Sequence, residues 1–211
     1  AQATIAIVSA IGGTPKLVTE KLDRSAGNLH WSDDSTLIHF VAPMNGGFPL
    51  YDVNVKTGDL HRFSTSVDIG VRAYDVSRDV VARVLTSPKN PSELFVTTPG
   101  SSSSRQLTTH NSTWLAAKKL SEYEPHTLKN DAGATVEFWT LKPTAFEPTK
   151  KYPLLLQIHG GPSAMWGPGE ESMWFEFQYF AARGYAIVFA NPRGSGGYGY
   201  DFQHANYQNW G

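Results

Sequence analysis

Two glycine-rich segments hold most of the residues that could do chemistry. His159-Gly160-Gly161-Pro162 follows one apolar run, and Asn191-Pro192-Arg193 follows the next. Read literally, Gly194, Gly196 and Gly199 spell G-x-G-x-x-G, the loop that holds a dinucleotide pyrophosphate at a helix N-terminus. In that loop the first glycine follows the strand directly, whereas here residues 191–193 intervene. We therefore expect a glycine-rich bend and no cofactor, with a dinucleotide-binding module as the alternative.

The elements around these segments form a recognisable pattern. "PLLLQIHGGP" is a continuous apolar run, which predicts a fully buried strand of a parallel sheet. "YAIVFA" predicts a second buried strand. Between them, one face of a predicted helix that stops at Gly184 carries Met173, Trp174, Phe177, Phe180 and Ala181. Strand, helix and strand make a βαβ unit, in which we expect the two glycine-rich segments to fold side by side.

The first 110 or so residues are patterned differently. Short β-type runs alternate with turn signals, and "GGTPKLVT", "TGDLHRFST" and "SSSRQLTT" recur about 45 residues apart. This period is typical of β-propeller blades, here one partial and two nearly complete. A small β-sandwich is the alternative. The character changes near residue 120, where "HTLKNDAGATVEFWTLKP" predicts a hairpin with its turn at "NDAG".

These motifs carry a family resemblance. "KYPLLLQIHGGP", "FAARGYAIVFANPRGSGGYG" and "NWG" together resemble the start of the catalytic domain of the prolyl oligopeptidase family. With His159 at its head, the first motif looks like the acylaminoacyl-peptidase and bacterial dipeptidyl-peptidase branches. The resemblance implies partial, all-β propeller blades over residues 1–120. The N-terminal part of an α/β-hydrolase domain would follow over residues 121–211.

The resemblance also implies a chemistry. In α/β-hydrolases a serine attacks the substrate, and the oxyanion is held by two backbone donors, one from the loop after an early strand. His159-Gly160-Gly161-Pro162 stands in that place, so Gly161 is the candidate donor and Gly160 shapes the loop. Pro162 stiffens it. We expect His159 to orient the loop rather than act as the base. An ordinary strand-to-helix turn is the alternative for the glycines.

Three residues of the second segment are expected to support the site. Arg193 brings a fixed charge and five donors, and we interpret it, with Asn191 and Tyr198, as structural support. No serine has G-x-S-x-G surroundings, since Ser163 fails at the last position and Ser195 at the first. The resemblance implies a Ser-Asp-His triad beyond Gly211. We expect a peptidase segment cut at both ends and inactive alone. A non-catalytic propeller scaffold is the alternative.

Composition excludes several other functions. The 211 residues have a formal net charge of -1 and no cysteine, which argues against nucleic-acid binding and thiolate chemistry. No apolar run approaches the roughly 20 residues of a membrane span. The histidines have no metal-binding spacing. The resemblance implies short peptide substrates and the remainder of the parent polypeptide as partners. Cytoplasmic, periplasmic and secreted locations all stay open, as does the oligomeric state.

Overall fold

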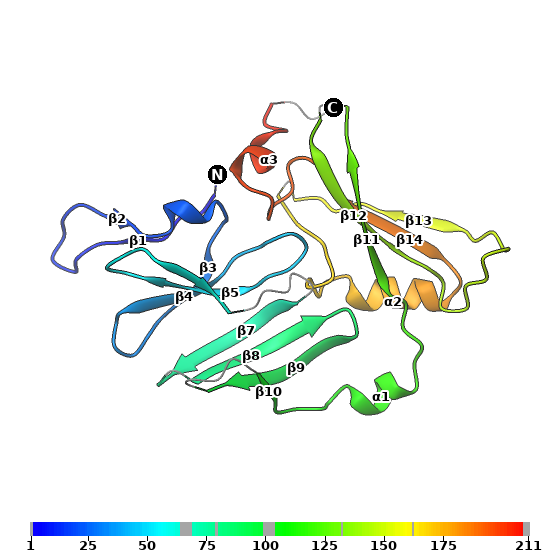
Figure 1. Ribbon diagram of the computed structural model, residues 1–211, viewed down its shortest axis with the longest axis horizontal. Helices are drawn as coiled ribbons and strands as arrows, with labels where there is room; N and C mark the ends of the chain where they lie inside the picture. The colour runs from blue at the N-terminus through cyan, green and yellow to red at the C-terminus, as the bar shows by residue number, and fades with distance from the viewer. Residues whose placement is uncertain are drawn as a thin grey trace.

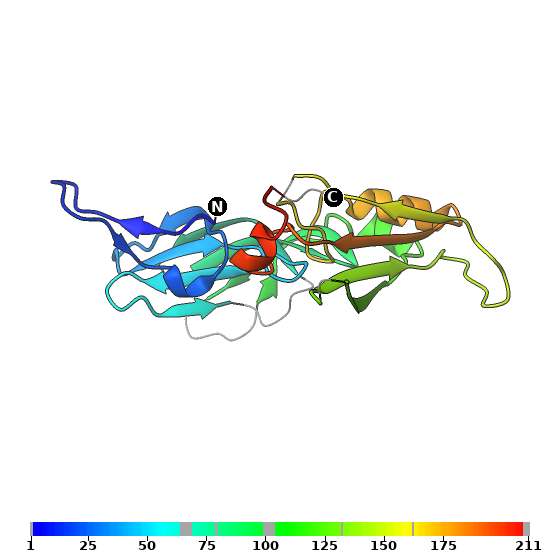
Figure 2. The ribbon, with the colours of Figure 1, turned by 90° about the horizontal axis from the view of Figure 1, so that it is seen from above.

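The chain is built mainly from β-sheets. The computed structural model describes residues 2–63, 69–78, 80–98, 104–131, 133–161 and 163–208. Its strands form one two-stranded and three four-stranded sheets, and no sheet closes on itself within these ranges. Figures 1 and 2 show the last sheet at one end of an elongated molecule and the N-terminal sheets toward the other, with the short helix α3 between them.

The N-terminal sheets are antiparallel and locally connected. A two-stranded pair and a short 3-10 helix (Glu20–Leu22) precede two four-stranded meanders, whose strand orders are β3-β4-β5-β6 and β10-β9-β8-β7. Val53 and Phe40 are fully buried in the first meander, and Leu50 packs with Val71 and Val81 between the two. The strands are β1 (Ala6–Ile7), β2 (Lys16–Leu17), β3 (Gly27–Trp31), β4 (Leu37–Val41), β5 (Leu50–Asn54), β6 (Leu60–Arg62), β7 (Gly70–Ser77), β8 (Val80–Ser87), β9 (Asn90–Thr97) and β10 (Arg105–Gln106).

The last sheet mixes two strand directions. β11 (Tyr123–Lys129) and β12 (Thr135–Leu141) form the predicted hairpin, whose turn is fixed by the Ala134 N–H donating to Asn130 Oδ1. β13 (Leu154–Gln157) and β14 (Ala186–Asn191) pair in parallel, and the sheet order is β11-β12-β14-β13. The predicted strand–helix–strand unit is therefore confirmed.

Helix α2 (Trp174–Ala182) connects the parallel strands and covers the sheet. Its predicted face is confirmed, because Phe177 and Ala181 pack against Trp139 and Phe189 of the sheet. The helix stops as predicted at Gly184, with the Tyr185 N–H donating to the Phe180 carbonyl and the Gly184 N–H to that of Ala181. Two further helices are one turn long, α1 (Ser112–Ala116) and α3 (Tyr200–His204).

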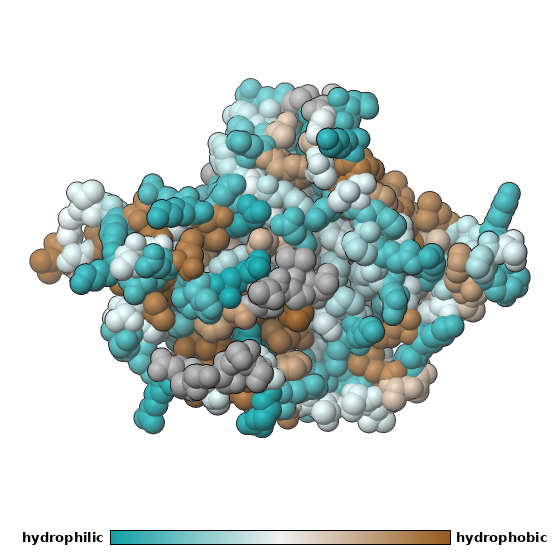
Figure 3. All heavy atoms as spheres, viewed as in Figure 1, coloured by the Kyte–Doolittle hydropathy of each residue, from teal (hydrophilic) through white to brown (hydrophobic). Residues whose placement is uncertain are grey.

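The prediction that β13 is fully buried is wrong for this chain. Leu154 and Leu156 are each 62% exposed, and Ile158 is 74% exposed. β13 is an edge strand that pairs with β14 alone among the described residues, so only Leu155 packs against the core of the sheet. In Figure 3 apolar residues gather along the edge where Figure 1 places β13.

A glycine seam joins the last sheet to the meanders. We use this name for Gly46, Gly70, Gly167 and Gly169. A Cβ on Gly70 would lie 1.7 Å from the Gly169 carbonyl oxygen, and one on Gly167 would lie 2.1 Å from that of Gly46. The Gly169 N–H donates to the Gly46 carbonyl over 3.0 Å. The seam thus fixes the loop between β13 and α2 by direct backbone contact.

Candidate active site

The two glycine-rich segments meet at one edge of the last sheet. Parallel strands end on the same side, and β13 and β14 pair in register from Leu154 with Ala186 to Gln157 with Phe189. The Gly196 N–H donates to the carbonyls of the segment after β13. Together the segments line a cavity of about 310 Å³, formed by His159, Gly160, Gly161, Pro192, Arg193, Ser195 and Asn206. The expected side-by-side arrangement is confirmed.

Asn191, the last residue of β14, ties the segments together. Its side chain is fully buried and makes four hydrogen bonds. Oδ1 accepts from the Trp166 N–H at 2.9 Å and lies 3.0 Å from His159 Nε2. Nδ2 donates to the Trp166 carbonyl at 2.7 Å and to the Tyr198 hydroxyl at 2.9 Å. Every hydrogen-bonding position of this amide is therefore used within the protein.

The Asn191 amide requires hydrogen on Nε2 of His159. Because Nδ2 faces Trp166 and Tyr198, the oxygen of the amide faces the imidazole, and Nε2 must be the donor. Nδ1 lies 3.1 Å from the Gly160 carbonyl, a contact that is a hydrogen bond only when Nδ1 carries hydrogen as well, and the ring packs edge-on against Trp166. With its Nε2 lone pair replaced by N–H, His159 cannot take a proton there, as general-base duty at Nε2 would require.

Ser195 lies beside a histidine, as a catalytic serine does, but it is not placed to act as a nucleophile. Its Oγ lies 3.2 Å from His159 Nε2, which resembles a serine–histidine pair. However, the serine is only 1% exposed and its hydroxyl donates to the Pro192 carbonyl at 2.7 Å. A nucleophile needs access to substrate and a base with a free lone pair, and Ser195 has neither. The sequence motif argued against Ser195 as a nucleophile, and it did not reveal this contact.

Gly161 occupies a conformation that other residues rarely adopt. Its φ is +139°, and an added Cβ would lie 2.6 Å from the Ala164 nitrogen and 2.8 Å from that of Ser163. A Cβ on Gly160 would meet open space. Among the described residues, neither glycine donates its N–H to the protein. Pro162, whose stiffening role was predicted, lies outside the described residues.

Several backbone N–H groups in and just after the second segment donate to the protein itself. The Gly194 N–H donates to the Phe202 carbonyl at 2.8 Å, and the Gly196 N–H reaches the segment after β13. The Tyr200 N–H, at the start of α3, donates to Asp23 Oδ1 at 2.8 Å. A dinucleotide loop needs such donors free for a pyrophosphate. Here a carboxylate already stands at the helix start, so the geometry disfavours a dinucleotide site.

Tyr198 extends the network to Glu137 on β12. The Tyr198 hydroxyl donates to Glu137 Oε2 at 2.8 Å. Burial, reinforced by the nearby Glu137, raises the pKa of Tyr198 far above its usual range, although the Asn191 hydrogen bond opposes this. Tyr198 therefore keeps its hydrogen. Arg193 lines the cavity and places Nη1 3.5 Å from the Ala205 carbonyl. Sequence reasoning missed Glu137, whose one signal is a charge within an apolar strand.

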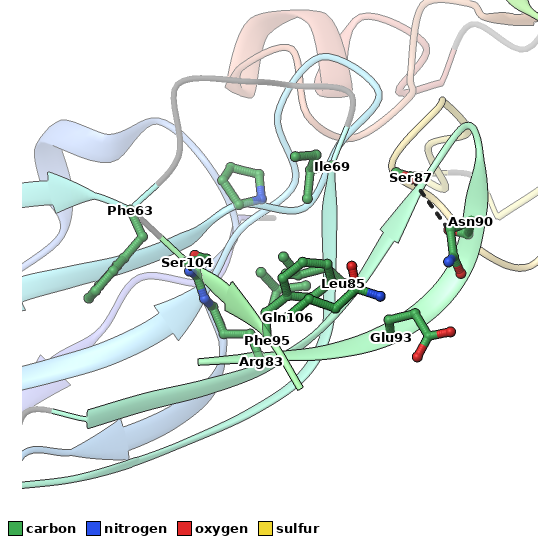
Figure 4. Close-up of a pocket in the computed structure, with 12 residues that line it drawn as sticks. Phe63, Ile69, Arg83, Leu85, Ser87, Asn90, Glu93, Phe95, Ser104 and Gln106 are labelled. Atoms are coloured by element: carbon green, nitrogen blue, oxygen red, sulfur yellow. Dashed lines mark hydrogen bonds between the residues drawn. The ribbon is translucent and has the colours of Figure 1, made fainter. Parts of the chain in front are cut away.

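A larger cavity lies between the two meanders. It measures about 630 Å³, and Figure 4 shows its walls, which include Phe63, Leu85 and Phe95. Among the described residues that line it, the two charged ones are both engaged by the protein. Arg83 donates to the hydroxyls of Thr97 and Ser104, and Glu93 accepts from the Thr108 hydroxyl and the Asn111 N–H. The cavity therefore offers no free acid–base pair for catalysis.

Among the residues that the structure describes, no group of three or more His, Asp and Glu side chains could hold a metal ion. No helix in the same ranges has both the length and the apolar character to cross a membrane.

Comparison with known proteins identifies the family. A profile described as the prolyl oligopeptidase family matches residues 171–211, which include α2, β14 and the second glycine-rich segment. The chain belongs to the prolyl oligopeptidase family. The uncharacterized peptidase YuxL of Bacillus subtilis is 33% identical over 178 residues, which cover 83% of this chain and 26% of that protein. Dipeptidyl-peptidase 5 of Aspergillus oryzae is 28% identical, over 90% of this chain and 26% of its own length.

Solved structures agree with this family assignment. The acylaminoacyl peptidase of Pyrococcus horikoshii matches 95% of this chain and 30% of its own, with a TM-score of 0.79 and 25% identity. Dipeptidyl peptidase 4 of Porphyromonas gingivalis has the same fold over 98% of this chain and 30% of its own, with a TM-score of 0.76 and 20% identity. The chain spans about a quarter of the length of its curated relatives.

Proposed function

We propose that this chain is part of a serine peptidase that hydrolyses short peptides, of the dipeptidyl-peptidase or acylaminoacyl-peptidase type. One observation carries the proposal. Gly160 and Gly161 line the cavity between the two segments, and their N–H groups are not used by any described residue. In the second segment, by contrast, the N–H groups of Gly194 and Gly196 donate within the protein. Uncommitted donors beside a cavity suit a developing oxyanion.

In this proposal each residue of the first segment has a distinct role. The Gly161 N–H binds the oxyanion, and losing one such donor typically costs roughly 3–4 kcal/mol of transition-state stabilisation. Gly160 shapes the loop. His159 orients it, because its Nε2–H is anchored on Asn191. Arg193, Asn191 and Tyr198 support the floor of the site from the second segment.

The proposed domains follow from the sheet types. Residues 1–120 would be β-propeller blades, since β3–β6 and β7–β10 are two consecutive four-stranded meanders. Residues 121–211 would begin an α/β-hydrolase domain, which the parallel pair crossed by α2 supports. A propeller beside the active site would restrict access to short peptides.

We propose that the nucleophile, the triad aspartate and the base histidine come from outside these 211 residues. No serine here stands in G-x-S-x-G, and Ser195 is buried with its hydrogen committed. The relatives are about four times as long as the matched region. The 211-residue chain alone should therefore neither cleave peptides nor react with a serine-directed phosphonate.

The test uses the full-length protein that contains this chain. Aminoacyl, dipeptidyl and acyl-aminoacyl chromogenic substrates are assayed, and a fluorophosphonate label is mapped by mass spectrometry. We expect hydrolysis of a blocked or dipeptidyl substrate, with the label outside residues 1–211. Gly161→Ala should lower kcat about 100-fold. Gly27→Ala is the control, because an added Cβ there meets nothing within 4 Å. Absence of hydrolysis by the wild type, or label on Ser163 or Ser195, would refute the proposal.

A further inference from the structure

We propose that Glu137 is a positioning residue for the Gly160–Gly161 loop, acting through Tyr198, Asn191 and His159. We call these four residues the relay. The inference rests on the proposed function of that loop, and it adds a residue from another strand. Glu137 lies on β12, directly opposite Asn191 in the β12–β14 ladder. Its carboxylate accepts the Tyr198 hydroxyl hydrogen at 2.8 Å.

The relay has a fixed direction because a carboxylate can only accept. Tyr198 must therefore donate to Glu137, and a lone pair of its oxygen is left to accept from Asn191 Nδ2. That contact acts together with the Trp166 backbone, whose N–H donates to Asn191 Oδ1 and whose carbonyl accepts from Nδ2. The oxygen of the amide therefore faces His159, and Nε2 carries hydrogen 3.0 Å from Oδ1. The carboxylate on β12 thus supports, through Tyr198, one of the contacts that hold this amide in place against the ring.

The anchored ring holds the glycine loop. His159 immediately precedes Gly160, so a ring anchored on Asn191 limits the rotation of the loop backbone. If Asn191 lost its contact with Tyr198, one Nδ2 hydrogen would be left without a partner in a buried place, and only the Trp166 backbone would still hold the amide. The Asn191 side chain would shift toward a new partner, and His159 and the donors of Gly160 and Gly161 would shift with it.

Paired variants separate the acceptor of Glu137 from its bulk. Glu137→Met keeps the length of the side chain and removes the acceptor, whereas Glu137→Gln keeps an oxygen that can accept from Tyr198. In the full-length protein, we expect Glu137→Met to lower kcat about 10- to 100-fold with KM changed less than about threefold, as for a displaced catalytic group. Glu137→Gln should stay within about threefold of wild type. Glu124→Met is the control, an exposed carboxylate in the same sheet paired with Lys142.

A second readout does not depend on activity. Ring ¹⁵N shifts of His159, assigned with His159→Gln, report which nitrogen is protonated. We expect Nε2–H with the same ring shifts in the wild type and in Glu137→Gln, and changed ring shifts in Glu137→Met, because the amide that anchors the ring has lost a contact. Unchanged kcat or unchanged ring shifts in folded Glu137→Met overturn the proposal. If Glu137→Met does not fold, Tyr198→Phe removes the same contact and decides by the same criteria. If the wild type hydrolyses no peptide, the proposed function fails, and the ring shifts alone decide on the relay.

Discussion

Replacing Asn191 by aspartate tests the residue that joins the two glycine-rich segments, because the only heavy atom that changes is Nδ2, which becomes an oxygen. Asn191→Asp preserves shape and both contacts made by Oδ1, but it removes the two hydrogens of Nδ2. The Trp166 carbonyl, 2.7 Å from Nδ2, and the Tyr198 hydroxyl, 2.9 Å away, would then face an oxygen. Because the side chain is fully buried, water cannot replace the lost donors.

The expected loss in the free energy of unfolding follows from these contacts. Each of the two lost hydrogen bonds contributes about 1 kcal/mol, and each acceptor left facing oxygen in a buried place adds about 1 kcal/mol more. We therefore expect Asn191→Asp to lower the free energy of unfolding by about 3–5 kcal/mol. Asn130→Asp is the matched control, because Asn130 uses only its oxygen, which accepts the Ala134 N–H. Its change should stay below about 0.5 kcal/mol.

The assay is urea unfolding of the full-length variants, with hydrogen exchange at the Trp166 amide as the local measure. Exchange at that amide should accelerate strongly in Asn191→Asp, because its hydrogen bond is made to the altered side chain. Equal unfolding midpoints for Asn191→Asp and Asn130→Asp, with Trp166 protection unchanged, would show that Asn191 Nδ2 does not hold the two segments together.

Two further predictions concern other parts of the molecule. Gly70→Ala places a Cβ 1.7 Å from the Gly169 carbonyl oxygen, so we expect a loss of about 1–3 kcal/mol in urea unfolding, whereas Gly27→Ala should be nearly neutral; equal effects would contradict close contact at the seam. Burial works to raise the pKa of Glu93, but hydrogen bonds from Thr108 and Asn111 outweigh it and lower the pKa below its usual value. A depressed pKa contributes stability above the unfolded value that is lost as pH falls through the folded value. Glu93→Gln should thus be less stable than wild type at neutral pH, and the difference should shrink as pH falls below about 4; a difference that stays constant or grows as pH falls from about 5 to about 2 would refute this.

Local pattern was enough to predict the elements. Apolar spacing placed the buried face of α2 on Trp174, Phe177 and Ala181, and glycine placed its end at Gly184, because both signals act within a few residues. Pattern failed at β13. A run such as Leu154 to Leu156 is the same whether a strand has one neighbour or two, and only the sheet order tells which.

The sequence predicted where the backbone of the site lies, but it did not predict the side-chain hydrogen bonds that connect its residues. The motifs placed Gly161 and Asn191 together, since adjacent parallel strands end side by side. Glu137 joins them from an antiparallel neighbouring strand, more than 50 residues away along the chain, and its one sequence signal, a charge within an apolar strand, does not name its partner. The contact between Ser195 and His159 was equally invisible, because it depends on side-chain direction rather than on spacing.

The glycine seam limits which substitutions the boundary between the meanders and the last sheet can accept. A contact made of side chains tolerates a larger residue on one side and a smaller one on the other, whereas two backbones already in contact leave no such exchange. We therefore expect Gly46, Gly70, Gly167 and Gly169 to be exchangeable only as a set, two from each side of the boundary. A chimera that joins the meanders of one relative to the last sheet of another should assemble only when the first brings Gly46 and Gly70 and the second brings Gly167 and Gly169.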